Sequence, residues 1–114
     1  MQSNNIVNLK ESEMSYADLE MKVVRWGEAR GIVQNATAMS QAIKTLEETT
    51  ELLSAINKDN IEEVKDAIGD IVVTLIMVCT VSNLSLVSCL GGAYNEIKDR
   101  KGYLTKEGVF VKEV

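Results

Sequence analysis

The sequence predicts an all-α fold, and three observations carry that prediction. Proline is absent and aromatic residues make up only 4% of the chain, while Leu, Ile, Val, Ala, Met, Glu and Lys dominate. Apolar residues recur at three- and four-residue steps, the period of an amphipathic helix. A chain of 114 residues is enough for one domain but short of two. We expect a flexible leader over residues 1–14 and one helical domain over 15–114, a four-helix-type bundle completed by oligomerisation, with a short extended C-terminal tail.

The first helix is predicted to begin after Ser15, an N-cap residue type followed by an acidic residue, Asp18, in the first turn. Gly31 is expected to end it. Its stripe consists of Tyr16, Leu19, Val23, Trp26 and Arg30.

A second helix is predicted to begin at Asn35 as its cap and to end before a turn at residues 57–60. Its apolar stripe consists of Met39, Ile43, Leu46, Thr50 and Leu53. Its other side carries Lys44, Glu47, Glu48 and Glu51.

The third helix is predicted to start at Asn60, which forms a capping pair with Glu63. Residues 71–81 are apolar on every side apart from Thr74 and Thr80, so the segment is expected to be buried in a bundle or oligomer, or to span a membrane. A span needs about 20 apolar residues, and polar residues interrupt the run from Ser82 onward. Burial between subunits of a homodimer or homotetramer is therefore favoured over a membrane.

A fourth helix is predicted from its cap Ser85 to about Arg100, with Gly102 ending it. The pair at 91–92, two glycines, indicates either close helix packing or a weak spot. The tail from 103 to 114 contains a short candidate strand at 108–111.

Composition excludes several classes of function. The net charge of −5 and the absence of a basic run argue against a nucleic-acid surface. Without histidine there is no His-based triad or His metal ligand, and no Walker-type phosphate loop is present. Cys79 and Cys89 lie in apolar context and are expected to be reduced thiols. Residues 2–13 are polar and lack the apolar core of a signal peptide. We therefore expect a cytoplasmic protein.

Two pairs of carboxylates are the main chemical signal. Glu48 and Glu51 share one helical face, and Asp66 and Asp70 share another. A solvated helix face would explain the glutamates alone. Asp70, however, stands mid-helix at the start of the apolar run, where a carboxylate should be paired or bound to metal. The cluster predicts a site for Mg²⁺, or Mn²⁺. Glu63 is discounted as a ligand because the helix dipole already explains it.

Several other residues are candidates for contacts to a substrate. Lys98, Arg100 and Lys101 are either cations at a helix C-terminus or contacts to a phosphate chain. Lys44 is either a second phosphate contact or an ion-pair partner of Glu48. Two further residues could contact the nucleoside, namely Asn95 through a hydrogen bond to base or sugar and Trp26 through base stacking, although a core position also explains Trp26.

These residues together resemble a known family. Glu47-Glu48-x-x-Glu51 on one helix and Gly69-Asp70 on the next look like the MazG-like family of all-α nucleoside triphosphate pyrophosphohydrolases. The segments 41–46 and 93–102 add to the resemblance, which covers about residues 16–113 and is similar to the small versions common in phages. One position departs from the pattern: the family usually has Glu three residues before its Asp, and this chain has Ala67. Asp66 lies on the same face and can take its place.

The resemblance implies a Mg²⁺-dependent enzyme that splits a nucleoside triphosphate into monophosphate and pyrophosphate, as nucleotide-pool house-cleaning. Glu48, Glu51, Asp66 and Asp70 would hold the metal, and Glu47 or Glu48 would orient or deprotonate water. Two alternatives stay open. One is a relative such as a dUTP/dCTP pyrophosphatase or a phosphoribosyl-ATP pyrophosphatase, and the other is a non-catalytic helical interaction protein.

Overall fold

The computed structural model describes residues 13–113, so the predicted leader lies outside it apart from its last two residues. Within that range the chain forms helices and one small β-hairpin, which confirms the all-α prediction. The elements are α1 (Tyr16–Ala29), α2 (Ile32–Asn35), α3 (Ala38–Asn57), α4 (Ile61–Val81), α5 (Leu86–Ile97), β1 (Gly102–Leu104) and β2 (Phe110–Lys112).

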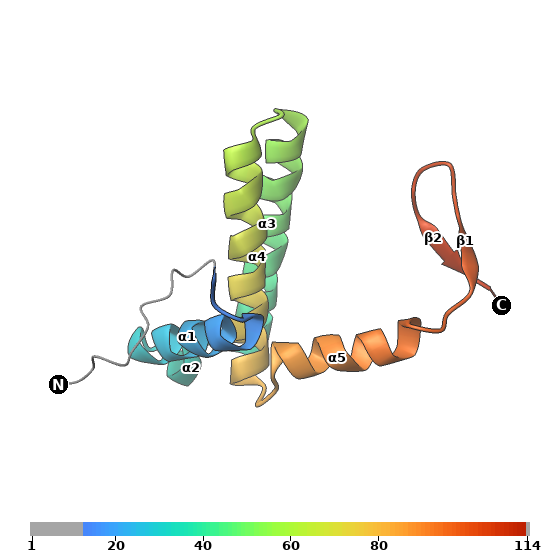
Figure 1. Cartoon of the computed structure of the whole chain (residues 1–114). Coiled ribbons are helices and arrows are strands. Elements are labelled where there is room, and N and C mark those ends of the chain that lie inside the picture. Colours follow the sequence, from blue (N-terminus) through green and yellow to red (C-terminus); the bar gives the residue numbers. More distant parts are fainter. Residues whose placement is uncertain (1–12, 114) are drawn as a thin grey trace.

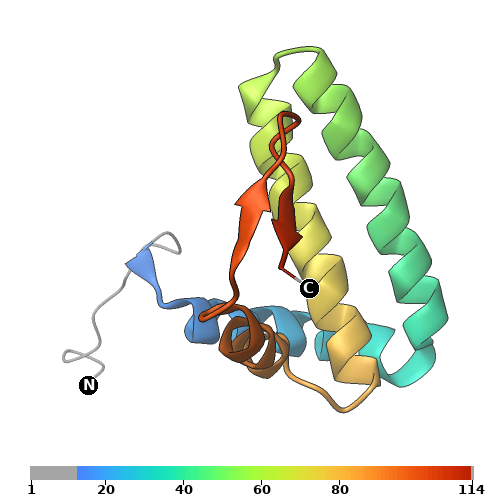
Figure 2. The same ribbon diagram turned by 90° about the vertical axis from the view of Figure 1, so that its right-hand side faces the viewer.

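Helices α3 and α4 form a long helical hairpin, the centre of the structure (Figures 1 and 2). Asn60 caps α4 as predicted, since its side chain accepts a hydrogen bond of 3.2 Å from the Glu63 backbone N–H. The two helices also share a polar contact, nearer the end where α3 begins, where the Thr45 and Thr74 hydroxyl oxygens lie 2.8 Å apart. Thr74 is 7% exposed, so this hydrogen bond satisfies a hydroxyl group that is cut off from water.

Helix α1 crosses one end of this hairpin (Figure 1). Its predicted cap is confirmed, because the Ser15 side chain accepts a hydrogen bond from the Asp18 N–H. Gly31 follows the helix with φ at 77°, a left-handed conformation that glycine adopts without strain. The close approach of α1 to α4 also depends on a glycine: a Cβ at Gly27 would lie 2.5 Å from Sδ of Met77.

The start of the second long helix differs from the prediction. Asn35 does not cap it; Asn35 ends the extra short helix α2, and its side-chain amide donates to the Gly31 carbonyl oxygen at 2.8 Å. Thr37 is the cap instead, and it forms a reciprocal capping box with Ser40. The helix therefore begins at Ala38, because a two-sided cap satisfies two backbone N–H groups where a single Asn would satisfy one.

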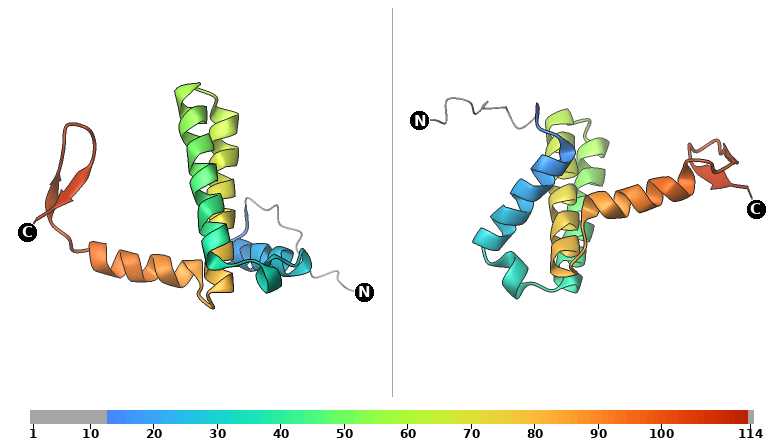
Figure 3. Two further views of the ribbon diagram at one scale, coloured as in Figure 1. Left: turned by 180° about the vertical axis from the view of Figure 1, so that it is seen from behind. Right: turned by 60° about the horizontal axis from the view of Figure 1, so that its bottom comes forward.

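Helix α5 extends away from the rest of the molecule as an arm (Figures 1 and 3). It is bent by 100° from α4, and none of its residues is buried. Its cap Ser85 is as predicted. The helix ends at Ile97, however, three residues before the predicted Arg100, because a turn closes with the Arg100 N–H donating to the Ile97 carbonyl oxygen.

Within residues 13–113 the paired glycines of α5 pack against no other element, since a Cβ at either position would meet no atom within 4 Å. Gly102, predicted to end the helix, instead opens β1, and it pairs with Lys112 in an antiparallel hairpin. The predicted extended tail is thus present as a two-stranded hairpin, with β2 beginning at Phe110.

The core is small and runs along α4, where that helix packs against α3 and, near its C-terminal end, against α1. Its buried apolar residues are Ala55, Ala67, Ile76, Met77 and Cys79. The predicted apolar stripe of α3 is largely uncovered, with Met39 70%, Leu46 68% and Leu53 65% exposed. Among the described residues no single helix is long and apolar enough to cross a membrane; α4 and α5 pass that test only as a pair bent by 100°.

Candidate active site

Two cavities lie along the α3–α4 hairpin and share Asp70 in their walls. The first, of about 430 Å³, lies at the end where α1 and α2 cross the hairpin. The second, of about 250 Å³, is walled almost entirely by acidic side chains. Asp70 therefore joins an acidic compartment to a larger, mixed one.

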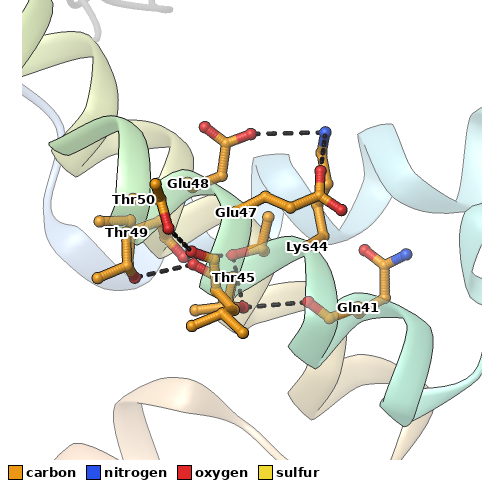
Figure 4. Close-up of polar contacts among 10 residues, drawn as sticks. Gln41, Lys44, Thr45, Glu47, Glu48, Thr49 and Thr50 are labelled. Atoms are coloured by element: carbon orange, nitrogen blue, oxygen red, sulfur yellow. Dashed lines mark hydrogen bonds and ion pairs between the residues drawn. The ribbon is translucent and has the colours of Figure 1, made fainter. Parts of the chain in front are cut away.

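The charged residues in the wall of the first cavity are Lys44, Glu47 and Glu48 on α3 and Asp70 on α4. The Lys44 ammonium lies 3.5 Å from Oε1 of Glu47 and 3.6 Å from Oε1 of Glu48, as Figure 4 shows. These carboxylates, Glu47 foremost, raise the pKa of Lys44. Glu48 is only 8% exposed, and a carboxylate so far removed from water is costly unless it is paired.

The apolar wall of the same cavity is formed by Trp26, Ile32, Val73 and Met77. Trp26 is 43% exposed, so it lies at the cavity rather than in the core. The Arg30 guanidinium lies 5.8 Å from the centre of the indole ring. An aromatic ring and charged groups in the wall of one cavity could serve the two parts of a nucleotide, a flat base and a phosphate chain.

The second cavity is lined by Glu51, Glu63, Asp66, Ala67 and Asp70. Three of the predicted metal ligands therefore meet here, and Glu48 lines the adjoining cavity. Ala67 is 5% exposed and faces the same space. At the position where the family usually has Glu, the chain presents only a methyl group, and the carboxylate of the neighbouring Asp66 lines the cavity instead.

Sequence reasoning had discounted Glu63, which the structure places in the acidic cavity. The spacing in the sequence could have placed Glu63 at this site, because Glu63, Asp66 and Asp70 lie three and four residues apart on one helical face. The explanation by the helix dipole also holds, because Glu63 takes part in the cap of α4 through Asn60 and pairs with Lys58 at 3.5 Å. The two roles are compatible.

The donor set fits a hard divalent cation, because every candidate ligand is a carboxylate oxygen. In the side-chain conformations of the structure, residues 13–113 contain no group of three acidic or cysteine side chains that could hold one ion. Glu51, Asp66 and Asp70 are exposed and free to rotate toward the cavity that they share.

The remaining predicted substrate contacts lie elsewhere. Asn95, Lys98, Arg100 and Lys101 are all exposed, at the far end of the α5 arm and just beyond it. None of them lines either cavity, and Figures 1 and 3 show the arm pointing away from the hairpin. Within one chain, the structure does not bring this basic segment to the carboxylates.

The fold and the acidic hairpin are those of a nucleotide pyrophosphohydrolase domain. Residues 36–104, more than half of the chain, match the MazG nucleotide pyrophosphohydrolase domain, and the protein belongs to that family. The resemblance seen in the sequence is thereby confirmed.

Two individual proteins are similar to this chain. One is an uncharacterised 18.2 kDa protein from the rep–hol intergenic region of Haemophilus phage HP1, 32% identical over 74 residues; these cover 62% of this chain but only 45% of the phage protein. The other is the solved structure of the cyanophage S-2L MazG-like pyrophosphohydrolase, bound to dGDP and three catalytic Mn²⁺ ions per active site. It shares the fold with a TM-score of 0.68 at 13% identity, over 91% of this chain and 98% of the cyanophage chain.

Proposed function

We propose that this protein is a Mg²⁺-dependent enzyme that hydrolyses nucleoside triphosphates to monophosphate and pyrophosphate, in nucleotide-pool house-cleaning. The observation that carries the proposal is the position of Asp70 in the walls of both cavities. A nucleotide lying in the larger cavity would direct its phosphates toward the acidic one. The nucleotide and the Mn²⁺ ions bound by the cyanophage protein support the same assignment.

Glu48, Glu51, Asp66 and Asp70 would hold the metal, with Glu63 close by. When bound, Mg²⁺ or Mn²⁺ neutralises the charge of a triphosphate and lowers the pKa of water at the site. The metal requirement also explains why so many carboxylates share one face, since without a cation they would repel one another.

The chain's other residues have separate tasks in this proposal. Trp26 stacks on the base, and its apolar neighbours exclude water from that end of the cavity. Lys44 donates hydrogen bonds to phosphate oxygens. Glu47, whose side chain is 59% exposed, accepts a proton from the attacking water or orients it, a task that needs a carboxylate not fully engaged in binding metal.

The proposed active form is a homodimer, or a tetramer built from dimers. The uncovered apolar stripe of α3 and the arm with no buried residue both support this, because one chain leaves these surfaces to water. A second copy packed on them would cover apolar area. It would also allow Lys98 and Arg100 of one copy to reach the phosphate end of the other copy's first cavity, with Asn95 and Lys101 beside them.

The single domain over residues 15–114 and the cytoplasmic location stay predictions.

A panel of nucleoside triphosphates tests the proposal. Canonical, deoxy and modified triphosphates, together with dUTP, dCTP and phosphoribosyl-ATP, are incubated with Mg²⁺, with Mn²⁺ and with excess chelator. We expect equal amounts of monophosphate and pyrophosphate for at least one substrate, and none with chelator. Release of inorganic phosphate instead, or turnover that survives chelation, would contradict the proposal. No turnover of any substrate would favour the interaction-protein alternative.

A further inference from the structure

Glu20 on α1 is a buried carboxylate that takes no part in the site described above. It is 6% exposed, yet it forms no ion pair with any Lys or Arg of residues 13–113. Its two oxygens accept from the beginning of α5 instead: Oε1 from the Val87 N–H at 2.9 Å, and Oε2 from the Ser85 hydroxyl at 3.0 Å. Such a group is costly to bury without partners, so these contacts are what allows it to remain there.

The contacts complete the cap of α5 from another helix. Val87 is the second residue of α5, and its N–H belongs to the first turn, where no intrahelical acceptor exists. The Ser85 side chain accepts from the Ser88 N–H while its own proton is donated to Glu20. A negative charge at this end of a helix is also favourable. Glu20 therefore ties α1 to the elbow between α4 and α5.

The elbow itself is closed by backbone hydrogen bonds, among them the Leu84 N–H to the Cys79 carbonyl oxygen at 2.7 Å. Beyond the elbow α5 is weakly held, because none of its residues is buried and a Cβ at the glycines near its centre would meet no atom of the described residues within 4 Å. A helix of 12 residues is about 18 Å long, so a rotation of about 10° at the elbow moves its far end by about 3 Å. That is the length of a hydrogen bond, enough to make or lose a contact at the basic end.

We propose that Glu20 is a positioning residue: it fixes the direction of the α5 arm and so places Lys98 and Arg100 for their contact with a triphosphate in the neighbouring copy. The first half of this proposal, that Glu20 fixes the elbow between α4 and α5, is independent of the function proposed above. The second half, that this places Lys98 and Arg100 for a triphosphate, rests on that function.

Hydrogen exchange in the full-length protein tests the first half. The variants are Glu20→Ala, which removes both contacts, Glu20→Gln, which keeps an acceptor but no charge, and Ser85→Ala. Exposed Glu28 on the same helix provides the matched control Glu28→Gln. We expect the Val87 amide to exchange about tenfold to hundredfold faster in Glu20→Ala, as loss of a hydrogen bond to a charged group predicts, and less so in Glu20→Gln. Amides of the α3–α4 hairpin should be unchanged.

Steady-state kinetics of the same variants tests the second half. Glu20→Ala should raise KM for the triphosphate about tenfold or more with a smaller change in kcat, while Glu28→Gln matches the wild type. Unchanged exchange at Val87 in Glu20→Ala would overturn the proposal, and if that variant does not fold, unchanged exchange in both Glu20→Gln and Ser85→Ala would do so. Faster exchange with unchanged KM would overturn the link to the basic segment. A wild type without turnover refutes the proposed function, and the exchange data still decide the role of Glu20 at the elbow.

Discussion

The ammonium of Lys44 lies 3.6 Å from Oε1 of Glu48, one helical turn away and at the wall of the larger cavity. Glu48 is also a predicted metal ligand, so Lys44 and a metal ion would draw on the same carboxylate. Two cations near one carboxylate repel each other, and binding of the metal would release the ammonium toward the cavity. Lys44 would then be available for phosphate only once the metal is bound.

The first prediction follows from that shared carboxylate. Lys44→Met should bind Mn²⁺ tighter than the wild type by about tenfold, since a repelling charge is removed from the site, while its affinity for a triphosphate falls. Calorimetric titration with Mn²⁺ alone measures the first effect. The matched control is Lys65→Met, which removes the same charge from an exposed ion pair with Glu62 at 3.5 Å. Equal Mn²⁺ affinity in Lys44→Met and the wild type would show that no competition exists.

The second prediction concerns the residue shared by the two cavities. Asp70→Asn should abolish turnover and weaken Mn²⁺ binding, because an amide oxygen carries no charge for the cation, while the helix content seen by circular dichroism persists. Asp59→Asn, in the turn between α3 and α4, removes an equal charge far from Asp70 and should behave as wild type. Full activity of Asp70→Asn would exclude this carboxylate from the metal site.

The third prediction concerns assembly. Sedimentation should show a dimer or tetramer at micromolar concentration, because large apolar side chains on α3 are exposed in the single chain. Leu46→Lys would place a charge in that surface and shift the population toward monomer. Ser54→Lys, at another exposed position of the same helix, about 80° around its axis from Leu46, should leave assembly unaltered. A folded wild-type monomer would contradict the prediction.

The fourth prediction concerns the basic segment. A double variant, Lys98→Ala with Arg100→Ala, should lose triphosphate use but keep the hairpin site. The Asp70→Asn variant loses the site but keeps the arm. If the α5 arm of one copy acts on the site of the other, the two variants, mixed 1:1 and re-assembled into dimers, should recover about a quarter of wild-type activity. Half of the dimers then contain one copy of each variant, and one of the two sites in each such dimer is competent.

Either of two results would contradict that fourth prediction. Full activity of the double variant by itself would mean that the basic segment is only a helix C-terminus. If the double variant is inactive and mixing restores nothing, the arm does not serve a neighbouring copy.

Local pattern predicted most of the fold, and its failures have local reasons. The caps at Ser15, Asn60 and Ser85 were predictable because each depends on a side chain and a backbone N–H within the next turn. The start of α3 was misplaced because Asn35 and Thr37 are both good caps, and only the reciprocal bond with Ser40 decides between them.

The candidate site was predictable in part for the same reason. Carboxylates three or four residues apart share a helix face wherever the helix goes, so the acidic cavity follows from spacing. The direction of α5 does not, because it depends on a contact between Glu20 and Val87, 67 residues apart. In the sequence Glu20 is one more charged residue on an amphipathic helix.

The hydroxyl pair of Thr45 and Thr74 has a consequence for the spacing of the carboxylates. Small apolar side chains such as Ala55 and Ala67 would let two helices slide along each other with little penalty, whereas the hydrogen bond between the two hydroxyl groups forms in one register only. Sliding by one turn would break this bond, so it favours the observed axial register of α3 against α4. Asp70 lies one turn before Thr74, and Glu48 lies three residues after Thr45. The separation of the carboxylates that would share a metal ion thus depends in part on two neutral side chains outside the proposed set of ligands.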